Sequence, residues 1–235
     1  MNNQKTTQSE ETRTSAITCT WDETANCASC EIKEKLDCKW EMKLLLRFFF
    51  LFAPALSLVF GAIIYAAVFI GDWWWLGVVL GYFALFFIVE TRILCSHCPY
   101  YSEEGLVLHC LANHGFIKFY RYHPEPMSKV EKILLIIGFL FFALVPLGAQ
   151  VYNIIIVGLS RESYSQTFFL VLLVLFGLSI VSIAIGFILL FTRICPKCVN
   201  FSCPWNSVPK EIVDDYLTKN PVMKKAWIEA DYKLE

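Results

Sequence analysis

Charge is the scarcest property of this sequence. Only 17% of its 235 residues are charged and the formal net charge is −1, whereas 57% of the residues are hydrophobic. Such a chain is not disordered as a whole, and without a basic excess we expect no nucleic acid among its partners. The sequence also lacks P-loop, GxGxxG, HExxH and serine-nucleophile motifs, so whether it is an enzyme stays open.

Four apolar runs exceed the roughly 20 residues that cross a bilayer, and they predict the fold class. The runs are Leu44–Ile70, Trp73–Leu94, Ile133–Leu159 and Thr167–Ile194. Helices of a soluble bundle would carry a polar face at 3.6-residue spacing, and these runs carry none. The sequence therefore predicts an all-α, polytopic membrane protein with four transmembrane helices.

Lysine and arginine are almost absent from the two short connections that join the runs into pairs. Of 20 such residues, only Arg161 lies there. The positive-inside rule then predicts a multi-pass protein of the cell membrane with both termini in the cytoplasm, and the lipid bilayer as its first partner. The polar N-terminal 40 residues lack the apolar core of a signal peptide.

Two features recur in the same order, which predicts an internal duplication. Gly61-Ala62-x-x-Tyr65 in the first run matches Gly148-Ala149-x-x-Tyr152 in the third, and Thr-Arg-Ile precedes a CxxC motif at the end of the second and fourth runs. We expect two repeated hairpins related by an axis along the membrane normal, with both CxxC motifs at one depth. Leu94 has no counterpart before Cys195, so the repeats differ by one residue.

These patterns divide the chain into six predicted segments. Both ends and the middle are expected to be cytoplasmic, and the tail is expected to form a short amphipathic helix from Lys210 to Lys219 that Pro221 separates from a second piece. The segments are a disordered tail (1–18), a cysteine-rich segment (19–43), a first hairpin (44–98), a cytoplasmic loop (99–129), a second hairpin (130–204) and a cytoplasmic tail (205–235).

All 10 cysteines fall on the predicted cytoplasmic side. A reducing compartment disfavours disulfides, so clustered thiols there more often bind metal or perform redox chemistry. The two CxxC motifs can together form a tetrahedral site, and four more thiols crowd the N-terminal segment. The candidate metal ligands are Cys19, Cys27, Cys30, Cys38, Cys95, Cys98, Cys110, Cys195, Cys198 and Cys203.

The metal itself stays open between zinc and an iron–sulfur cluster, because soft thiolates suit both. A histidine could replace a thiolate in a Cys3His site, and the middle loop holds four of them: His97, His109, His114 and His123. A disulfide between Cys19 and Cys38 is the rival if the predicted orientation is wrong.

Cysteines next to proline after the even-numbered spans carry a resemblance. Cys95 and Cys98 with Pro99, and Cys198 and Cys203 with Pro204, resemble the cytoplasmic Cys-Pro motifs of four-span membrane electron-transfer proteins of periplasmic nitrate and nitrous-oxide respiration. The chain is also similar to uncharacterised prokaryotic membrane proteins with CxxCP turns. The first resemblance implies electron transfer through a cytoplasmic iron–sulfur centre.

Three functions follow as hypotheses. The first is electron transfer from a thiolate-held iron–sulfur centre to a quinone or a redox partner protein. The second is a structural zinc site that locks a membrane transporter or assembly factor. The third is a thiol-redox or metal-handling protein that uses exchangeable cysteines.

Overall fold

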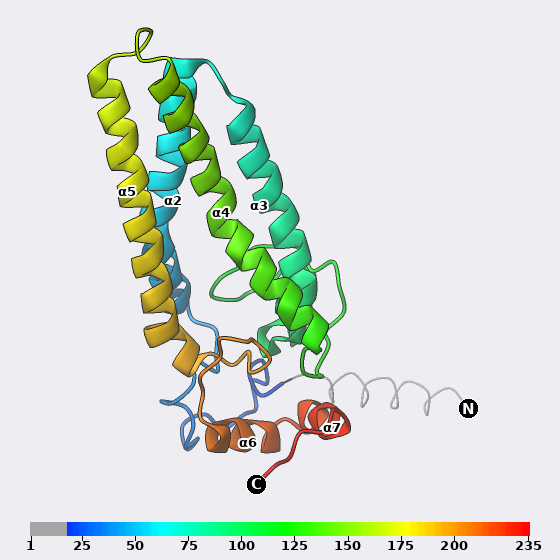
Figure 1. Cartoon of the computed structure of the whole chain (residues 1–235). Coiled ribbons are helices and arrows are strands. Elements are labelled where there is room, and N and C mark those ends of the chain that lie inside the picture. Colours follow the sequence, from blue (N-terminus) through cyan, green and yellow to red (C-terminus); the bar gives the residue numbers. More distant parts are fainter. Residues whose placement is uncertain (1–17) are drawn as a thin grey trace. The chain divides into compact units, whose positions relative to one another are not determined.

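The computed structural model describes residues 18–235. The predicted disordered tail therefore lies outside the described residues, except for its last residue, Thr18. Within the described range the protein is all-α (Figure 1). Besides the α-helices it has short 3₁₀ turns, one π turn and one isolated β-bridge between Val107 and Ile117. The predicted fold class is confirmed to this extent.

Four long helices correspond to the four apolar runs. They are α2 (Met42–Ile70), α3 (Trp74–Ile93), α4 (Lys129–Leu159) and α5 (Gln166–Leu189). All four are long and apolar enough to cross a membrane. Only 17–39% of the residues in their most apolar windows are buried inside the protein. Apolar side chains therefore cover the outside of these helices, as lipid-facing residues do.

The chain divides into two compact units. The first, here called the cysteine unit, comprises residues 18–46, 90–132 and 191–235 of the described chain, and the second, the helical unit, comprises Arg47–Val89 and Ile133–Leu190. All ten cysteines belong to the cysteine unit. The two units are described separately below.

Aromatic side chains pack the helical unit. The Phe83 and Phe142 rings of α3 and α4 stack with centroids 4.3 Å apart, and Phe60 of α2 meets Phe83 edge-on at 5.4 Å. The Tyr82 hydroxyl donates a 2.8 Å hydrogen bond to the Gly138 carbonyl. Small residues allow close approach, since an added Cβ at Gly138 would lie 3.1 Å from the Phe86 ring.

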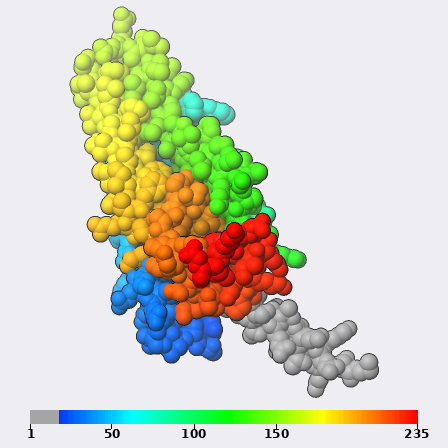
Figure 2. Space-filling model, turned by 60° about the horizontal axis from the view of Figure 1, so that its bottom comes forward, coloured from blue at the N-terminus to red at the C-terminus, as the bar shows by residue number. Residues whose placement is uncertain are grey.

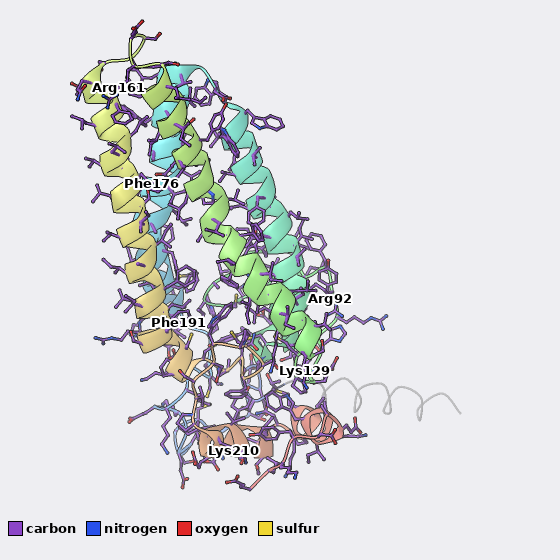
Figure 3. The ribbon with its side chains drawn as sticks, in the orientation of Figure 1. Arg92, Lys129, Arg161, Phe176, Phe191 and Lys210 are labelled. Carbon is purple, nitrogen blue, oxygen red and sulfur yellow. The ribbon has the colours of Figure 1, made fainter. Side chains whose placement is uncertain are left out.

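Local signals fix both ends of the short connections. The Ser165 side chain caps α5 by accepting a hydrogen bond from the Phe168 amide at 3.1 Å. Gly71 has φ +83°, which favours glycine, and the Asp72 carboxylate accepts from the Trp74 amide at the start of α3. Figure 3 shows Arg161, the one cation of these connections, where the chain passes from α4 to α5.

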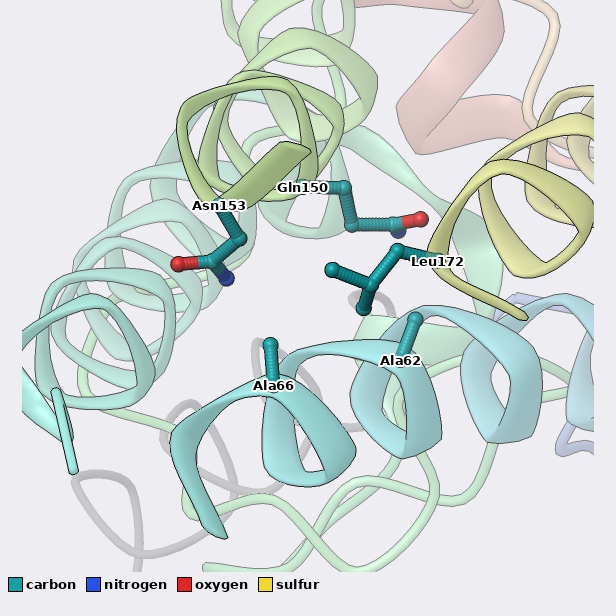
Figure 4. A pocket seen from close by; sticks show the side chains of 5 residues that line it. All are labelled: Ala62, Ala66, Gln150, Asn153 and Leu172. Carbon is teal, nitrogen blue, oxygen red and sulfur yellow. The ribbon is translucent and has the colours of Figure 1, made fainter. Parts of the chain in front are cut away.

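One polar spot interrupts the apolar interior of the helical unit. Gln150 and Asn153 of α4 are 4% and 2% exposed and point into a gap lined by Ala62, Ala66 and Leu172 (Figure 4). Neither amide atom of Gln150, nor the Asn153 Oδ1, has a hydrogen-bond partner among the described residues. These amides therefore add no hydrogen bond between helices through those atoms, so helix–helix adhesion does not explain them.

The cysteine unit contains little regular structure. Its helical parts beyond the ends of the long helices are 3₁₀ turns and two short helices, α6 (Lys210–Thr218) and α7 (Pro221–Glu229). These helices confirm the amphipathic helix predicted from Lys210 and the break at Pro221. In Figure 2 the tail, orange to red, lies against the blue N-terminal segment, where Thr20 and Tyr216 share a 2.8 Å hydrogen bond.

Candidate metal centre

Three chain segments far apart in sequence build the cysteine unit. The Asp37 amide donates to the Lys197 carbonyl at 2.9 Å, and the Trp40 indole donates to the Cys110 carbonyl at 3.3 Å. The Asn200 amide donates to the Leu94 carbonyl at 3.0 Å. The N-terminal segment, the middle loop and the chain after α5 are therefore joined directly.

The two CxxC motifs form the same local structure. Each folds as a 3₁₀ turn, Cys95–His97 and Cys195–Lys197, in which the amide of the second cysteine donates to the carbonyl of the first, at 2.9 Å and 3.4 Å. The preceding residues, Leu94 and Ile194, have nearly identical backbone angles (φ −101°, ψ −53° and φ −103°, ψ −52°). Ile194 thus takes the place of Leu94.

A π-helical turn lies where the two sequences differ by one residue. It spans Leu190–Ile194, directly before the second CxxC turn, whereas α3 runs as an α-helix to Ile93. A π turn shifts the register of a helix by one residue relative to an α turn. The size of this shift matches the one-residue mismatch in the sequence.

Six cysteines follow α3 or α5 in the chain, and we call them the helix-end thiols: Cys95, Cys98, Cys110, Cys195, Cys198 and Cys203. Asn113 connects two of them, since its side-chain amide donates to the Cys95 sulfur at 3.1 Å and its backbone amide to the Cys110 sulfur at 3.0 Å. The same side-chain amide donates to the Glu90 carboxylate at 2.7 Å. Asn113 is 3% exposed, so these donors are withdrawn from water.

Electrostatics link the remaining helix-end thiols. Burial raises the pKa of Cys98 well above its usual value, and the neighbouring Cys198, Cys110 and Cys203 raise it further. Burial followed by the charge of Cys198 raises the pKa of Cys203 to about 12, and burial raises that of Cys198 to about 11, with Cys195 as a neighbour. These influences connect Cys98 of the first CxxC motif with Cys198 of the second.

The other four cysteines form a second group, the N-terminal thiols: Cys19, Cys27, Cys30 and Cys38. Burial and then the charges of Cys19, Cys30 and Cys27 raise the pKa of Cys38 to about 12. A second buried asparagine serves this group, since the Asn220 side-chain amide donates to the Cys19 sulfur at 3.2 Å and its oxygen accepts from the Cys19 amide at 2.6 Å. Each thiol group therefore has one buried asparagine directed at a sulfur.

Tyr100 is adjacent to both groups. It is 2% exposed, and its hydroxyl donates to the Asp37 carbonyl at 2.5 Å. Burial raises its pKa, and Cys98 and Cys198 of one group and Cys38 of the other add to the effect. The two thiol groups thus share a buried aromatic side chain.

The four histidines have other partners. His97 bonds the Glu125 carbonyl through Nδ1 at 2.7 Å, while His109 and His123 lie 2.8 Å from the carboxylates of Glu103 and Glu125. The His114 ring stacks on Trp40 with centroids 5.1 Å apart. Among the described residues, the buried His97 Nε2 and His114 Nδ1 have no hydrogen-bond partner.

Thiolate is a suitable ligand for zinc and iron, but the described residues do not form a complete coordination sphere. All ten cysteines are free thiols, and no three His, Cys, Asp or Glu side chains between residues 18 and 235 are arranged as ligands of one metal ion. Neighbouring donors and burial tune metal-binding thiolates; both groups have an asparagine donor, and Cys95, Cys110 and Cys195 are buried whereas the N-terminal thiols are half-buried. The helix-end thiols and the N-terminal thiols are therefore the candidate metal ligands.

Two residues of this site carry no clear sequence signal. Asn113 follows Cys110 by three residues, a spacing that lets its amide reach back to the cysteine sulfur, but Asn220 is 201 residues from Cys19. Only the fold brings Asn220 to its cysteine.

Comparison with known proteins gives no relatives. No family model matches the chain, and no curated protein or solved structure matches it either.

Proposed function

We propose that this protein is an integral membrane protein that transfers electrons through a thiolate-held iron–sulfur centre at the helix-end thiols. One observation carries the proposal: six cysteines from two chain segments, three of them buried, include a pair whose sulfurs both accept hydrogen bonds from the Asn113 amides. Hydrogen bonds to sulfur, burial and solvent exclusion are the means by which proteins set the potential of such centres.

The membrane location supports this function. Four helices are long and apolar enough to span a membrane, and the distribution of lysine and arginine favours cytoplasmic termini. All ten thiols would then lie in a reducing compartment, where metal-binding thiolates are stable. A centre at the ends of membrane-spanning helices is placed to exchange single electrons with a quinone or a redox partner protein.

The internal duplication explains how the site arose. The matching 3₁₀ turns at Cys95–His97 and Cys195–Lys197 support two repeated hairpins that each supply one CxxC pair. Duplication of one hairpin with a CxxC motif would supply four thiols. Cys110 and Cys203 then extend the group beyond the needs of a single zinc ion.

A structural metal at the N-terminal thiols is a second proposed role. Residues 19–40 contain no helix or strand in the described structure, yet Ile32 and Leu36 are 1% and 2% exposed. A segment that buries residues without regular backbone hydrogen bonding needs another source of order, and a zinc ion on four thiolates supplies it. In the alternative function, zinc occupies both groups and has a structural role in a membrane transporter or assembly factor.

Anaerobic purification followed by metal analysis, optical spectroscopy and electron paramagnetic resonance tests the proposal. We expect iron and sulfide together with a chromophore that dithionite bleaches and that gives a paramagnetic signal when reduced. A colourless protein with stoichiometric zinc in both groups would end the electron-transfer function and retain the structural one. A metal-free, folded protein with ten reactive thiols would end both.

A further inference from the structure

The loop between α3 and α4 contains a small β-hairpin whose outer side is apolar. The Lys118 amide donates to the Leu106 carbonyl at 2.7 Å, and the Leu108 amide to the Phe116 carbonyl at 2.8 Å. Val107 and Ile117 form the bridge pair between these bonds. We call residues 106–119 the apolar hairpin.

The two sides of the apolar hairpin differ in surroundings. Side chains alternate along a strand, so the bridge partners Val107 and Ile117 share one side, and Leu108 and Lys118 share the other. Leu108 is 1% exposed, and Lys118 is buried with its ammonium group on the Glu103 carbonyl at 2.6 Å. This second side therefore faces the protein.

The outer side is exposed over several large apolar residues. Val107 is 42% exposed, Ile117 55% and Phe119 63%. A soluble ribbon with one buried side places polar residues on the other. Here the order is reversed, because the one lysine is buried and the apolar residues are outside. Adjacent exposed apolar side chains of this kind mark a surface for an apolar neighbour.

The position of the hairpin in the chain indicates which neighbour. It lies between Ile93, the last residue of α3, and Lys129, the first residue of α4, so both of its ends lead into helices long enough to span a membrane. Arg121 and Lys129, on its C-terminal side, are exposed cations. Apolar and aromatic side chains next to cations are the composition of segments that lie in the headgroup region.

We propose that the apolar hairpin inserts its outer side, Val107, Ile117 and Phe119, into the boundary between lipid headgroups and acyl chains. This inference rests on the membrane location in the proposed function but not on the metal. The hairpin would hold the middle loop, and with it Cys110 and Asn113, against the bilayer surface. A partner protein or a second copy of the chain on the same surface is the alternative that the experiment must separate.

Site-specific photocrosslinking in the full-length protein tests this proposal. p-Benzoylphenylalanine replaces Phe119 in one variant and Ile117 in another, and Lys225 of α7, which is 78% exposed, is the matched control. The proteins are reconstituted into vesicles of phosphatidylethanolamine and phosphatidylglycerol, irradiated and analysed by intact mass spectrometry. Both hairpin sites are exposed, so the replacements leave the core unchanged.

We expect phospholipid adducts at positions 119 and 117 and none at 225. Crosslinks to protein, or no lipid adduct at either hairpin site, would overturn the proposal. Carbonate extraction of the same vesicles gives the separate test of the membrane location. Protein that stays in the membrane without lipid adducts contradicts only the hairpin insertion, whereas released protein contradicts the proposed location itself.

Discussion

The two units of this protein obtain their order from different sources. The helical unit has long helices, aromatic stacking and no cysteine, whereas the cysteine unit has short turns, two helices of nine residues and all ten thiols. A membrane satisfies the first kind of structure, because helices pair all of their backbone groups internally and lipid accepts apolar side chains. The short turns of the cysteine unit do not pair all of their backbone groups internally, and lipid does not surround them.

The comparison indicates what the thiols contribute. The cysteine unit buries a mixed core that includes Tyr100, Tyr216, Leu217 and Trp227, but most of its chain lacks regular hydrogen bonding. Small loop-rich units commonly depend on metals for stability. We therefore expect the metal to govern the cysteine unit and to leave the helical unit nearly unaffected, and the variants below test this separation.

The largest effect is expected from removing a ligand in one thiol group. Cys198→Ser should abolish the metal of the helix-end thiols, since binding of metal to thiolates and folding of the site are one event. Metal analysis of the purified variant measures the loss. The helical content in circular dichroism should remain, because the four long helices do not depend on the site.

Cys27→Ser is the matched control for that variant. It should remove only the metal of the N-terminal thiols, because the cysteines that raise the pKa of Cys38 are all in that group. If either serine variant lost the metal of both groups in equal measure, the division into two sites would be wrong.

Asn113→Ala should have the second largest effect. It removes the side-chain donor to the Cys95 sulfur while keeping the backbone donor to Cys110. Lost second-sphere hydrogen bonds typically cost about 10- to 100-fold in metal affinity, and fewer donors to sulfur lower the reduction potential of a cluster. Competition with a chelator and a redox titration measure the two quantities.

Asn220→Ala provides the comparison for Asn113. It removes the donor to the Cys19 sulfur, so it should leave the potential of the helix-end centre unchanged. Equal potentials in the wild type and in Asn113→Ala would show that the Asn113 amide does not act on the centre.

A packing change in the helical unit should lower the stability of that unit and leave the metal content unchanged. In Gly138→Ala the new Cβ meets the Phe86 ring at 3.1 Å, whereas Gly148→Ala meets nothing within 4 Å. Overpacking should make the first variant about 1–2 kcal/mol less stable than the second. Thermal unfolding in detergent measures the difference, and both variants should keep the wild-type metal content.

The smallest effect concerns the tail of the cysteine unit. Burial acts to raise the pKa of Asp214, but hydrogen bonds from Lys210 and Tyr232, at 2.7 and 2.8 Å, hold it below its usual value. The depressed pKa contributes stability above the unfolded pKa of about 3.9, and this contribution is lost as the pH falls through the lower folded value.

Asp214→Asn should therefore destabilise the tail at pH 7 and converge with the wild type in acid. Fluorescence of Trp227, whose ring lies 5.0 Å from that of Tyr232, follows this part of the chain. A constant difference between the two proteins from pH 7 to acid would contradict the assigned role of the carboxylate.

The helical unit was the more predictable from sequence. The run Trp73–Leu94 and the helix Trp74–Ile93 differ by one residue at each end, because a long apolar run leaves a helix little alternative in a membrane. The break at Pro221, in the tail of the cysteine unit, was also predictable, because proline cannot continue a helix. These are local signals, and local signals survive folding.

The cysteine unit was predictable in its composition and in its tail helices, but not in its tertiary contacts. Spacing indicated which cysteines belong together, but Asn220 reaches Cys19 across 201 residues and Thr20 reaches Tyr216 across 196. The exposed outer side of the apolar hairpin likewise depends on Lys118 turning inward to Glu103. Such contacts come from tertiary structure, which no periodicity in the sequence encodes.

Hydrogen exchange followed by mass spectrometry, with and without metal, tests the central claim most directly. In the full-length protein, metal loading should slow exchange in residues 18–40, 95–123 and 195–206 and leave α2, α3, α4 and α5 unchanged. Exchange that is identical in the metal-loaded and metal-stripped protein throughout these three segments would contradict the claim that metal orders the cysteine unit.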